Sequence, residues 1–232
     1  MKYDNILTAA FLSRPNRFIA EIEVNGKTEI AHVKNTGRCG ELFLRGTRVY
    51  VQRSDNPARK TKYDLIAVQK GNELINVDSQ APNKVFGEWV SDGKFIEKVS
   101  LIKPECKYQN SRFDFYIEAD GRKIFAEIKG VTLEENGVVM FPDAPTERGV
   151  KHIKELCACM EDGYEAYLFF VIQMEHCRYF TPNRKTHPEF ADALTEAEQK
   201  GVKIGALNCT VTSDTLKIHS PVEVKLSSRR CR

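Results

Sequence analysis

One stretch of the chain is almost continuously apolar and limits the folds that the sequence can adopt. Residues 166–172 read Ala-Tyr-Leu-Phe-Phe-Val-Ile, which is the pattern of a central strand covered on both faces. Apolar stripes at helical spacing run along residues 150–160 and 190–197, and each is closed by a glycine. Strand patterns over residues 124–131 and 202–209 complete the order strand, helix, strand, helix, strand. This order predicts an α/β domain.

A turn signal, Asp120-Gly121, separates two alternating segments and predicts a hairpin. Glu127 and Lys129 are two residues apart and share one face of their strand, and the pairing brings Asp114 close to Glu127. Two neighbouring carboxylates repel each other unless a cation lies between them, and hard oxygen ligands favour Mg²⁺ or Mn²⁺. Lys129 would then stabilise the charge of a pentavalent phosphate. The pattern predicts metal-dependent phosphodiester cleavage, with Asp114 and Glu127 as metal ligands and Lys129 as their catalytic partner.

The same residue types are also common as solvated cross-strand pairs, and an acid followed by Glu-x-Lys occurs often by chance. Two more residues are candidates for this site. Gln173 leaves the end of the central strand, where it would hydrogen-bond the attacking water or the phosphate as a further catalytic residue. Its alternative is an ordinary polar strand end. Glu88, in the helical segment 84–90, is a candidate additional acid, although most exposed helical glutamates have no such role.

Positive charge is concentrated in the first part of the chain. Residues 1–82 hold 13 Lys and Arg against 9 Asp and Glu, whereas residues 83–232 hold 22 against 23. A turn-rich stretch at residues 79–83 separates the two parts, so we expect one domain over 1–82 and a second over 83–232. A basic stripe of this density suggests contact with a polyanion, although basic runs are also often solvated surface. The candidate nucleic-acid contacts in it are Lys34, Arg38, Arg45, Arg48, Arg59, Lys60 and Lys62.

Short strands are expected in the basic part at residues 18–24, 28–33, 48–52 and 63–69, about five in all, as in a small barrel. Such a barrel is OB-like, and barrels of that kind bind nucleic acid with basic side chains and stacked aromatic rings. The candidate rings are Phe18, Tyr50 and Tyr63, although aromatic residues in strands more often belong to the core.

A second basic group, Arg148, Lys151 and His152, is expected on the exposed side of the helix that begins near Thr146, where it would meet phosphate. The alternative is a solvated face with Glu147 and Lys151 paired across one turn.

Composition excludes several classes of protein. The hydrophobic content of 41% over 232 residues is enough for a proper core, and no apolar run approaches the length that spans a bilayer. The opening residues lack the layout of a signal peptide, so we expect a cytoplasmic protein without a membrane partner. Seven cysteines without a CxxC pair argue against both a disulfide framework and a zinc site. The sequence gives no indication of the oligomeric state.

Several motifs together resemble the sugar fermentation stimulation protein A family. They are residues 35–39 (Asn-Thr-Gly-Arg-Cys), 56–61 (Asn-Pro-Ala-Arg-Lys-Thr), 111–115 (Ser-Arg-Phe-Asp-Phe), 127–129 (Glu-Ile-Lys) and 141–149 (Phe-Pro-Asp-Ala-Pro-Thr-Glu-Arg-Gly). The resemblance runs along nearly the whole chain. It implies an N-terminal OB-like barrel followed by a restriction-endonuclease-like α/β domain with a central mixed sheet, similar to the PD-(D/E)XK nucleases. Phe113 stands where that superfamily's name has Pro, and Cys39 where many relatives have Met.

The resemblance maps the nuclease-like motif to Asp114, Glu127 and Lys129, and Gln173 to a position used in exonuclease and resolvase relatives. It implies sequence-nonspecific DNA binding and a link to the regulation of maltose metabolism. Two hypotheses remain: a DNA-binding protein that acts without cleavage, and a Mg²⁺- or Mn²⁺-dependent DNA nuclease. Processing of RNA is a third, and nothing in the sequence excludes it. The fold alone does not decide among them.

Overall fold

A computed structural model describes residues 1–35, 37–109 and 111–226. The first six strands form one sheet in the order β3-β2-β1-β4-β5-β6, and parallel pairing of β3 with β5 closes β1 to β5 into a barrel. Their bounds are β1 Ile6–Asn16, β2 Ile19–Val24, β3 Lys27–Val33, β4 Arg48–Arg53, β5 Tyr63–Lys70 and β6 Glu73–Asn76. The OB-like barrel expected from the sequence is confirmed.

The second part is built on a six-stranded mixed sheet in the order β15-β14-β12-β9-β8-β7. Its elements are α1 Ala81–Ser91, β7 Val99–Tyr108, β8 Ser111–Ala119, β9 Arg122–Val131, β10 Leu133–Glu135, β11 Val138–Phe141, α2 Glu147–Glu161, β12 Glu165–Ile172, β13 Tyr179–Pro182, α3 Pro188–Gln199, β14 Lys203–Val211 and β15 Leu216–Val222. Strands β9, β12 and β14 run parallel, and β7, β8 and β15 pair antiparallel to their neighbours. Strands β10, β11 and β13 form a small separate sheet.

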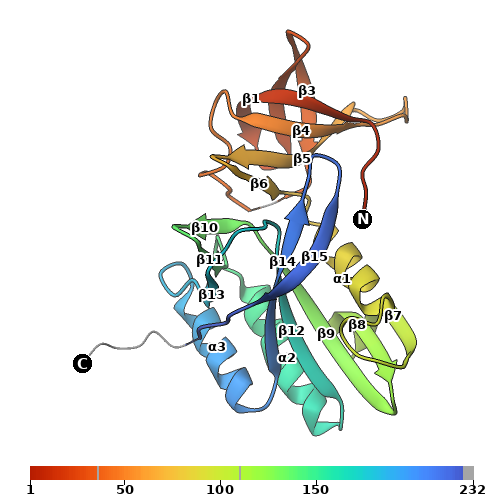
Figure 1. The fold of residues 1–232 in the computed structure, drawn as a ribbon. Coiled ribbons are helices and arrows are strands. Elements are labelled where there is room, and N and C mark those ends of the chain that lie inside the picture. Colours follow the sequence, from red (N-terminus) through yellow and green to blue (C-terminus); the bar gives the residue numbers. More distant parts are fainter. Residues whose placement is uncertain (36, 110, 227–232) are drawn as a thin grey trace.

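Helices cover both faces of the mixed sheet, and β12 is central, as its apolar sequence predicts. On one face the ring of Phe86 in α1 packs against Phe115 and Phe169 at centroid distances of 5.3 and 4.9 Å. On the other face α2 and α3 lie side by side over a core that contains Phe125 and Phe170. Figure 1 shows the barrel above one end of this sheet. The mixed α/β domain is confirmed.

Polar contacts from β5 and β6 join the two parts. The backbone amide of Asn76 donates to the carbonyl of Gln173 at 2.9 Å, and Lys70 Nζ lies 2.6 Å from Glu134 Oε2. The chain start also crosses over, since Lys2 bridges to Thr215. The expected boundary after residue 82 falls inside α1.

The hairpin expected around Asp120-Gly121 is confirmed and sets the register of the candidate site. Asp120 and Gly121 both have positive φ, at 50° and 76°, as the tight two-residue turn requires. The ladder between β8 and β9 runs from Ala119 opposite Arg122 to Phe115 opposite Ala126. Continuing this register by one residue places Asp114 opposite Glu127.

Candidate metal site and nucleic-acid interface

Asp114 lies one residue beyond the last pair of the β8–β9 ladder, Phe115 opposite Ala126. There the Asp114 side chain, rather than a backbone carbonyl of β8, accepts a hydrogen bond from β9. Asp114 Oδ2 accepts a hydrogen bond from the backbone amide of Ile128 at 2.7 Å, and Oδ1 accepts from Asn83 Nδ2 of α1 at 2.8 Å. These two donors fix the carboxylate between the strands. The carboxylate of Asp114 therefore lies between α1 and β9, next to the residue that follows Glu127.

Glu127 is almost fully buried, with 2% of its surface exposed, on the face of β9 that α2 covers. Lys129 Nζ lies 2.5 Å from Glu127 Oε1, so the two residues share one face as their spacing predicts. His152 Nδ1 of α2 contacts the same oxygen. The second oxygen, Oε2, is buried and has no hydrogen-bond partner among the described residues.

The pKa values of the two carboxyl groups are shifted in opposite directions. Burial, followed by the negative charge of Glu127, raises the pKa of Asp114 to about 6. Burial also disfavours the charged form of Glu127, but hydrogen bonding to His152 and the charge of Lys129 outweigh it and lower the pKa of Glu127. A buried anion with one unpartnered oxygen thus lies beside a carboxyl group that resists ionisation. Lys129 supplies one positive charge to this pair of acids, and a bound cation would further favour the ionised form of Asp114.

The donor set fits a hard divalent cation. Asp114 and Glu127 offer carboxylate oxygens, and Mg²⁺ is commonly bound by one or two carboxylates while it keeps several waters. No group of three or more His, Cys, Asp or Glu side chains arranged to hold a metal occurs among the described residues. The protein ligands would therefore be the two carboxylates, with Glu127 Oε2 as the free contact.

His152 is not on the exposed side of α2, so that expectation is wrong. Only 6% of its surface is exposed, and it points into the sheet against Glu127. Arg148 Nε, one turn earlier, donates to His152 Nε2 at 3.2 Å. Because Nε2 accepts this hydrogen bond, the proton of a neutral imidazole lies on Nδ1, where it is donated to Glu127. His152 thus connects the surface arginine to the buried carboxylate.

Arg148 and Lys151 are exposed, as expected, and they line a groove of about 720 Å³ between α2 and the β7–β8 hairpin. The opposite wall carries Lys107 and Arg112, and no carboxylate lines the groove. Lys151 pairs with Glu155 at 3.7 Å rather than with Glu147, and Arg112 pairs with Glu105 at 2.7 Å. The groove is therefore a basic surface, and His152 in its lining contacts Glu127 directly.

The side chain of Gln173 does not lie on the same face of the sheet as Glu127 and Lys129. It continues the face of β12 that includes Phe169 and Val171, on the α1 side, whereas Glu127 and Lys129 face α2. Its Nε2 donates to Asn76 Oδ1 at 2.9 Å and to the carbonyl of Asp78 at 3.0 Å. The strand-end argument placed Gln173 at the correct edge of the sheet but on the wrong face, because side chains alternate along a strand.

Glu88 is also remote from the site. It is exposed, and its Oε2 lies 2.7 Å from the amino group of Met1. The contact from α1 to the site comes instead from Asn83, five residues earlier. Sequence reasoning missed Asn83 because an amide near a helix start has many ordinary roles.

The basic residues of the barrel fall into two groups. Lys34 and Arg59 are tied to buried carboxylates: Lys34 Nζ lies 3.2 Å from Asp78 and Arg59 makes a two-point contact with Asp64. Lys62 is exposed but pairs with Glu29 at 3.3 Å. A further four candidates are exposed and form no ion pair with the described residues: Arg38, Arg45, Arg48 and Lys60.

Of the three candidate stacking rings, Phe18 is exposed by 44% and has Arg17 over its face at 4.8 Å. Tyr63 is buried in the barrel core, and Tyr50 packs partly buried against the cluster around Tyr3. The core alternative therefore holds for Tyr63, and Phe18 is the ring that remains available to a base.

Membrane-spanning helices are not found in the parts of the chain that the structure describes. The six cysteines among the described residues are all free thiols.

A barrel joined to a mixed α/β sheet with paired acids at a strand edge defines a two-domain protein of the OB-plus-α/β class. Two family models match it: the SfsA N-terminal OB domain over residues 12–77, and the sugar fermentation stimulation protein RE domain over residues 80–215. The chain belongs to the sugar fermentation stimulation protein family.

Relatives match it over nearly their whole length. The chain is 59% identical to the sugar fermentation stimulation protein homolog of Ruminiclostridium cellulolyticum over 226 residues, which cover 97% of this chain and 100% of the relative. A homolog from Desulfitobacterium hafniense is 61% identical, with 97% and 99% covered. A solved structure, that of Pyrococcus furiosus SfsA in complex with Ca²⁺, is similar with a TM-score of 0.88 at 29% identity, covering 97% of this chain and 98% of that one.

Proposed function

We propose that this protein binds DNA without sequence preference and that Asp114 and Glu127 hold a divalent cation at the edge of the binding surface. One observation carries the proposal: Arg148 of the basic groove contacts His152, which contacts Glu127. One imidazole thus connects Arg148, which is suited to bind phosphate, with Glu127, which is suited to bind a cation.

The support for DNA binding is electrostatic. The groove presents Lys107, Arg112, Arg148 and Lys151 without a lining acid, and the barrel adds its four unpaired basic residues. Phosphate contacts supply most nonspecific affinity and are insensitive to sequence. An OB barrel is itself a common single-strand binding fold, in which exposed rings such as Phe18 stack on bases.

The support for a cation is the site's chemistry together with a relative. The similar P. furiosus protein was solved in complex with Ca²⁺, and Glu127 Oε2 here is a buried oxygen without a partner. We propose Mg²⁺ or Mn²⁺ as the bound ion, since both accept carboxylate oxygens and water. When bound, such an ion would neutralise phosphate charge and acidify a coordinated water. Lys129, 2.5 Å from Glu127, would stabilise negative charge at the same place.

A second candidate function is a Mg²⁺- or Mn²⁺-dependent DNA nuclease of the PD-(D/E)XK kind. The placement of Lys129 favours it, because a protein that only binds DNA has no need of two converging carboxylates with a lysine held 2.5 Å from Glu127. The link to maltose metabolism and the cytoplasmic location stay predictions.

Fluorescence anisotropy with labelled duplex and single-stranded DNA across a salt series tests the binding proposal. We expect tight binding at low salt that weakens linearly on a log–log plot, and equal affinity for unrelated sequences of the same base composition. Absence of binding to both forms at low salt would contradict the proposal.

Incubation of linear, nicked and single-stranded DNA with Mg²⁺ or Mn²⁺ separates the two functions. Glu127→Ala and Lys129→Ala serve as inactive controls, and RNA substrates are tested in parallel. Cleavage by the wild type that both variants lose supports the nuclease. If the wild type and both variants leave every substrate intact while DNA still binds, the protein acts by binding alone.

A further inference from the structure

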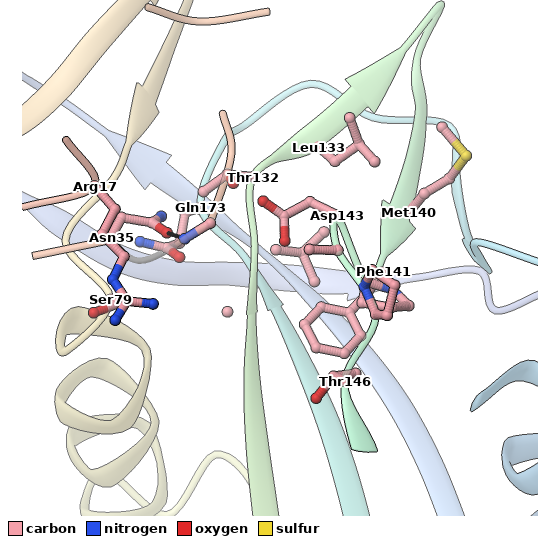
Figure 2. A pocket seen from close by; sticks show the side chains of 16 residues that line it. Arg17, Asn35, Ser79, Thr132, Leu133, Met140, Phe141, Asp143, Thr146 and Gln173 are labelled. Carbon is pink, nitrogen blue, oxygen red and sulfur yellow. Dashed lines mark hydrogen bonds between the residues drawn. The ribbon is translucent and has the colours of Figure 1, made fainter. Parts of the chain in front are cut away.

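A pocket of about 360 Å³ lies between the barrel and the α/β domain, beside the ends of β9 and β12. Figure 2 shows Arg17, Asn35 and Ser79 on one side of it and Asp143, Phe141 and Thr146 on the other, with Gln173 among the first group. The pocket includes much of the segment 141–149, a motif that the metal site leaves unexplained.

This segment is held rigidly by both domains. Asp143 Oδ2 accepts a hydrogen bond from the backbone amide of Arg38 in the barrel at 2.9 Å. Thr146 begins α2 as its cap, with Oγ1 accepting from the amide of Gly149 at 3.1 Å. The ring of Phe141 packs against Phe190 at 5.2 Å. The pocket wall is therefore built in advance rather than formed by a loose loop.

Two acceptor oxygens are presented to this pocket. Both protons of Gln173 Nε2 are used on the Asn76 side chain and the Asp78 carbonyl, which fixes the orientation of the amide. Gln173 is 1% exposed, yet no hydrogen bond reaches its Oε1 from the described residues, and this oxygen lies over Gly130 in the pocket lining. Asp143 Oδ1 likewise receives no hydrogen bond from them.

The cavity thus combines a carboxylate, a fixed amide oxygen and one cation, Arg17, in the lining. A ligand that fits would donate hydrogen bonds to Asp143 and Gln173 from one edge and carry a negatively charged group near Arg17. A nucleotide has this layout, since guanine and adenine carry amino donors on a planar edge and the phosphate is negative. The volume lies at the small end of the range for ligand pockets and suits a single nucleotide.

We propose that the interdomain pocket binds one unpaired purine nucleotide of a bound DNA strand. Its base lies against Asp143 and Gln173, and its phosphate lies at Arg17. This inference rests on the proposed function, because it takes DNA as the partner. It assigns the segment 141–149 a role in holding an extruded base, a conformation that costs little in a single strand.

The test uses short single-stranded DNA with one 2-aminopurine, whose fluorescence increases when the base leaves the stack. A separate dye on the same strand reports overall affinity by anisotropy. We expect the full-length wild type to increase the 2-aminopurine signal at saturation. Asp143→Asn, which keeps an oxygen for the Arg38 amide, should weaken base occupancy about tenfold because a charged acceptor is lost. Arg17→Ala, at an exposed position, provides a second variant that leaves the fold intact.

Lys98→Ala is the matched control, since Lys98 is an exposed lysine next to the far turn of the β8–β9 hairpin and pairs with Asp120. It should leave both signals unchanged. If anisotropy shows binding while the 2-aminopurine signal stays flat, or if both pocket variants match the wild type, the pocket assignment is wrong and the proposed function stands. If anisotropy shows no binding, both are wrong.

Discussion

The imidazole of His152 bridges Arg148 on the surface and Glu127 in the interior, and it is hydrogen-bonded at both ring nitrogens. Such a bridge orients the carboxylate and keeps one of its oxygens occupied, whereas the other, Oε2, is buried and has no hydrogen-bond partner among the described residues. The helix α2 therefore acts on the site through an imidazole rather than through a charged side chain.

Replacement of His152 by Ala should destabilise the protein by about 1–3 kcal/mol at neutral pH, because it removes a hydrogen bond from a buried carboxylate. Urea unfolding measures the change. His152→Asn retains a short donor near the position of Nδ1 and should recover part of the loss. Equal stability of all three proteins would show that the bridge contributes nothing.

In the metal-free protein, Asp114→Asn should gain stability relative to the wild type as the pH rises. The folded-state pKa of Asp114 is raised to about 6 from 3.8, so the native state holds its proton more tightly than the unfolded state does. Ionised Asp114 therefore costs stability, fully above pH 6 and not at all below about pH 4. The stability of Asp114→Asn relative to the wild type should rise by about 2–3 kcal/mol from pH 3.5 to pH 7.5. The amide group also meets one of the two N–H donors of Asp114, which adds a constant cost at every pH. A pH series of unfolding curves checks this, and a pH-independent difference would contradict it.

The double variant Arg148→Ala, Lys151→Ala should reduce DNA affinity and also flatten its dependence on salt. Each phosphate contact contributes about 0.9 to the log–log slope for duplex DNA, so the slope should fall by about 2. Anisotropy titrations at several salt concentrations measure both quantities, with Lys98→Ala as the surface control. A slope that stays at the wild-type value would place the DNA elsewhere.

Gly130→Ala should be destabilising, by about 1–3 kcal/mol, because a Cβ there would meet Gln173 Oε1 at 2.6 Å and Pro82 Cγ at 2.8 Å. Gly40→Ala is the matched control, since nothing lies within 4 Å of its Cβ position. Thermal unfolding compares the two. Similar melting temperatures would show that the side chains of Gln173 and Pro82 move aside at little cost in free energy.

Much of the fold is predictable from the sequence because its strongest patterns are local. The apolar run of β12, the helical stripes of α2 and α3, and the Asp120-Gly121 turn each determine one element through short-range geometry. The strands that no pattern revealed are β1, β6, β7, β10, β11, β13 and β15. Most of them lie at sheet edges or in the small sheet, where one face is solvated and the alternation is weak.

The site was predictable only as far as a single hairpin determines it. Alternation along β9 brings Glu127 and Lys129 together, and the register of the hairpin predicts Asp114 opposite Glu127. His152, Asn83 and Gln173 depend instead on how helices and the barrel dock against the sheet. Those placements follow from tertiary packing, which spacing along the chain does not encode.

If Asp114 and Glu127 together hold a divalent cation, the isolated protein should bind Mn²⁺. Isothermal titration of Mn²⁺ into the full-length protein at pH 7.5 tests it most directly, with Glu127→Gln and Asp114→Asn as site variants and Glu88→Gln as an acid remote from the site. We expect saturable binding of one ion by the wild type and Glu88→Gln, and loss of about tenfold or more in affinity in both site variants. Equal Mn²⁺ affinity in all four proteins, or no binding by the wild type, would contradict the account.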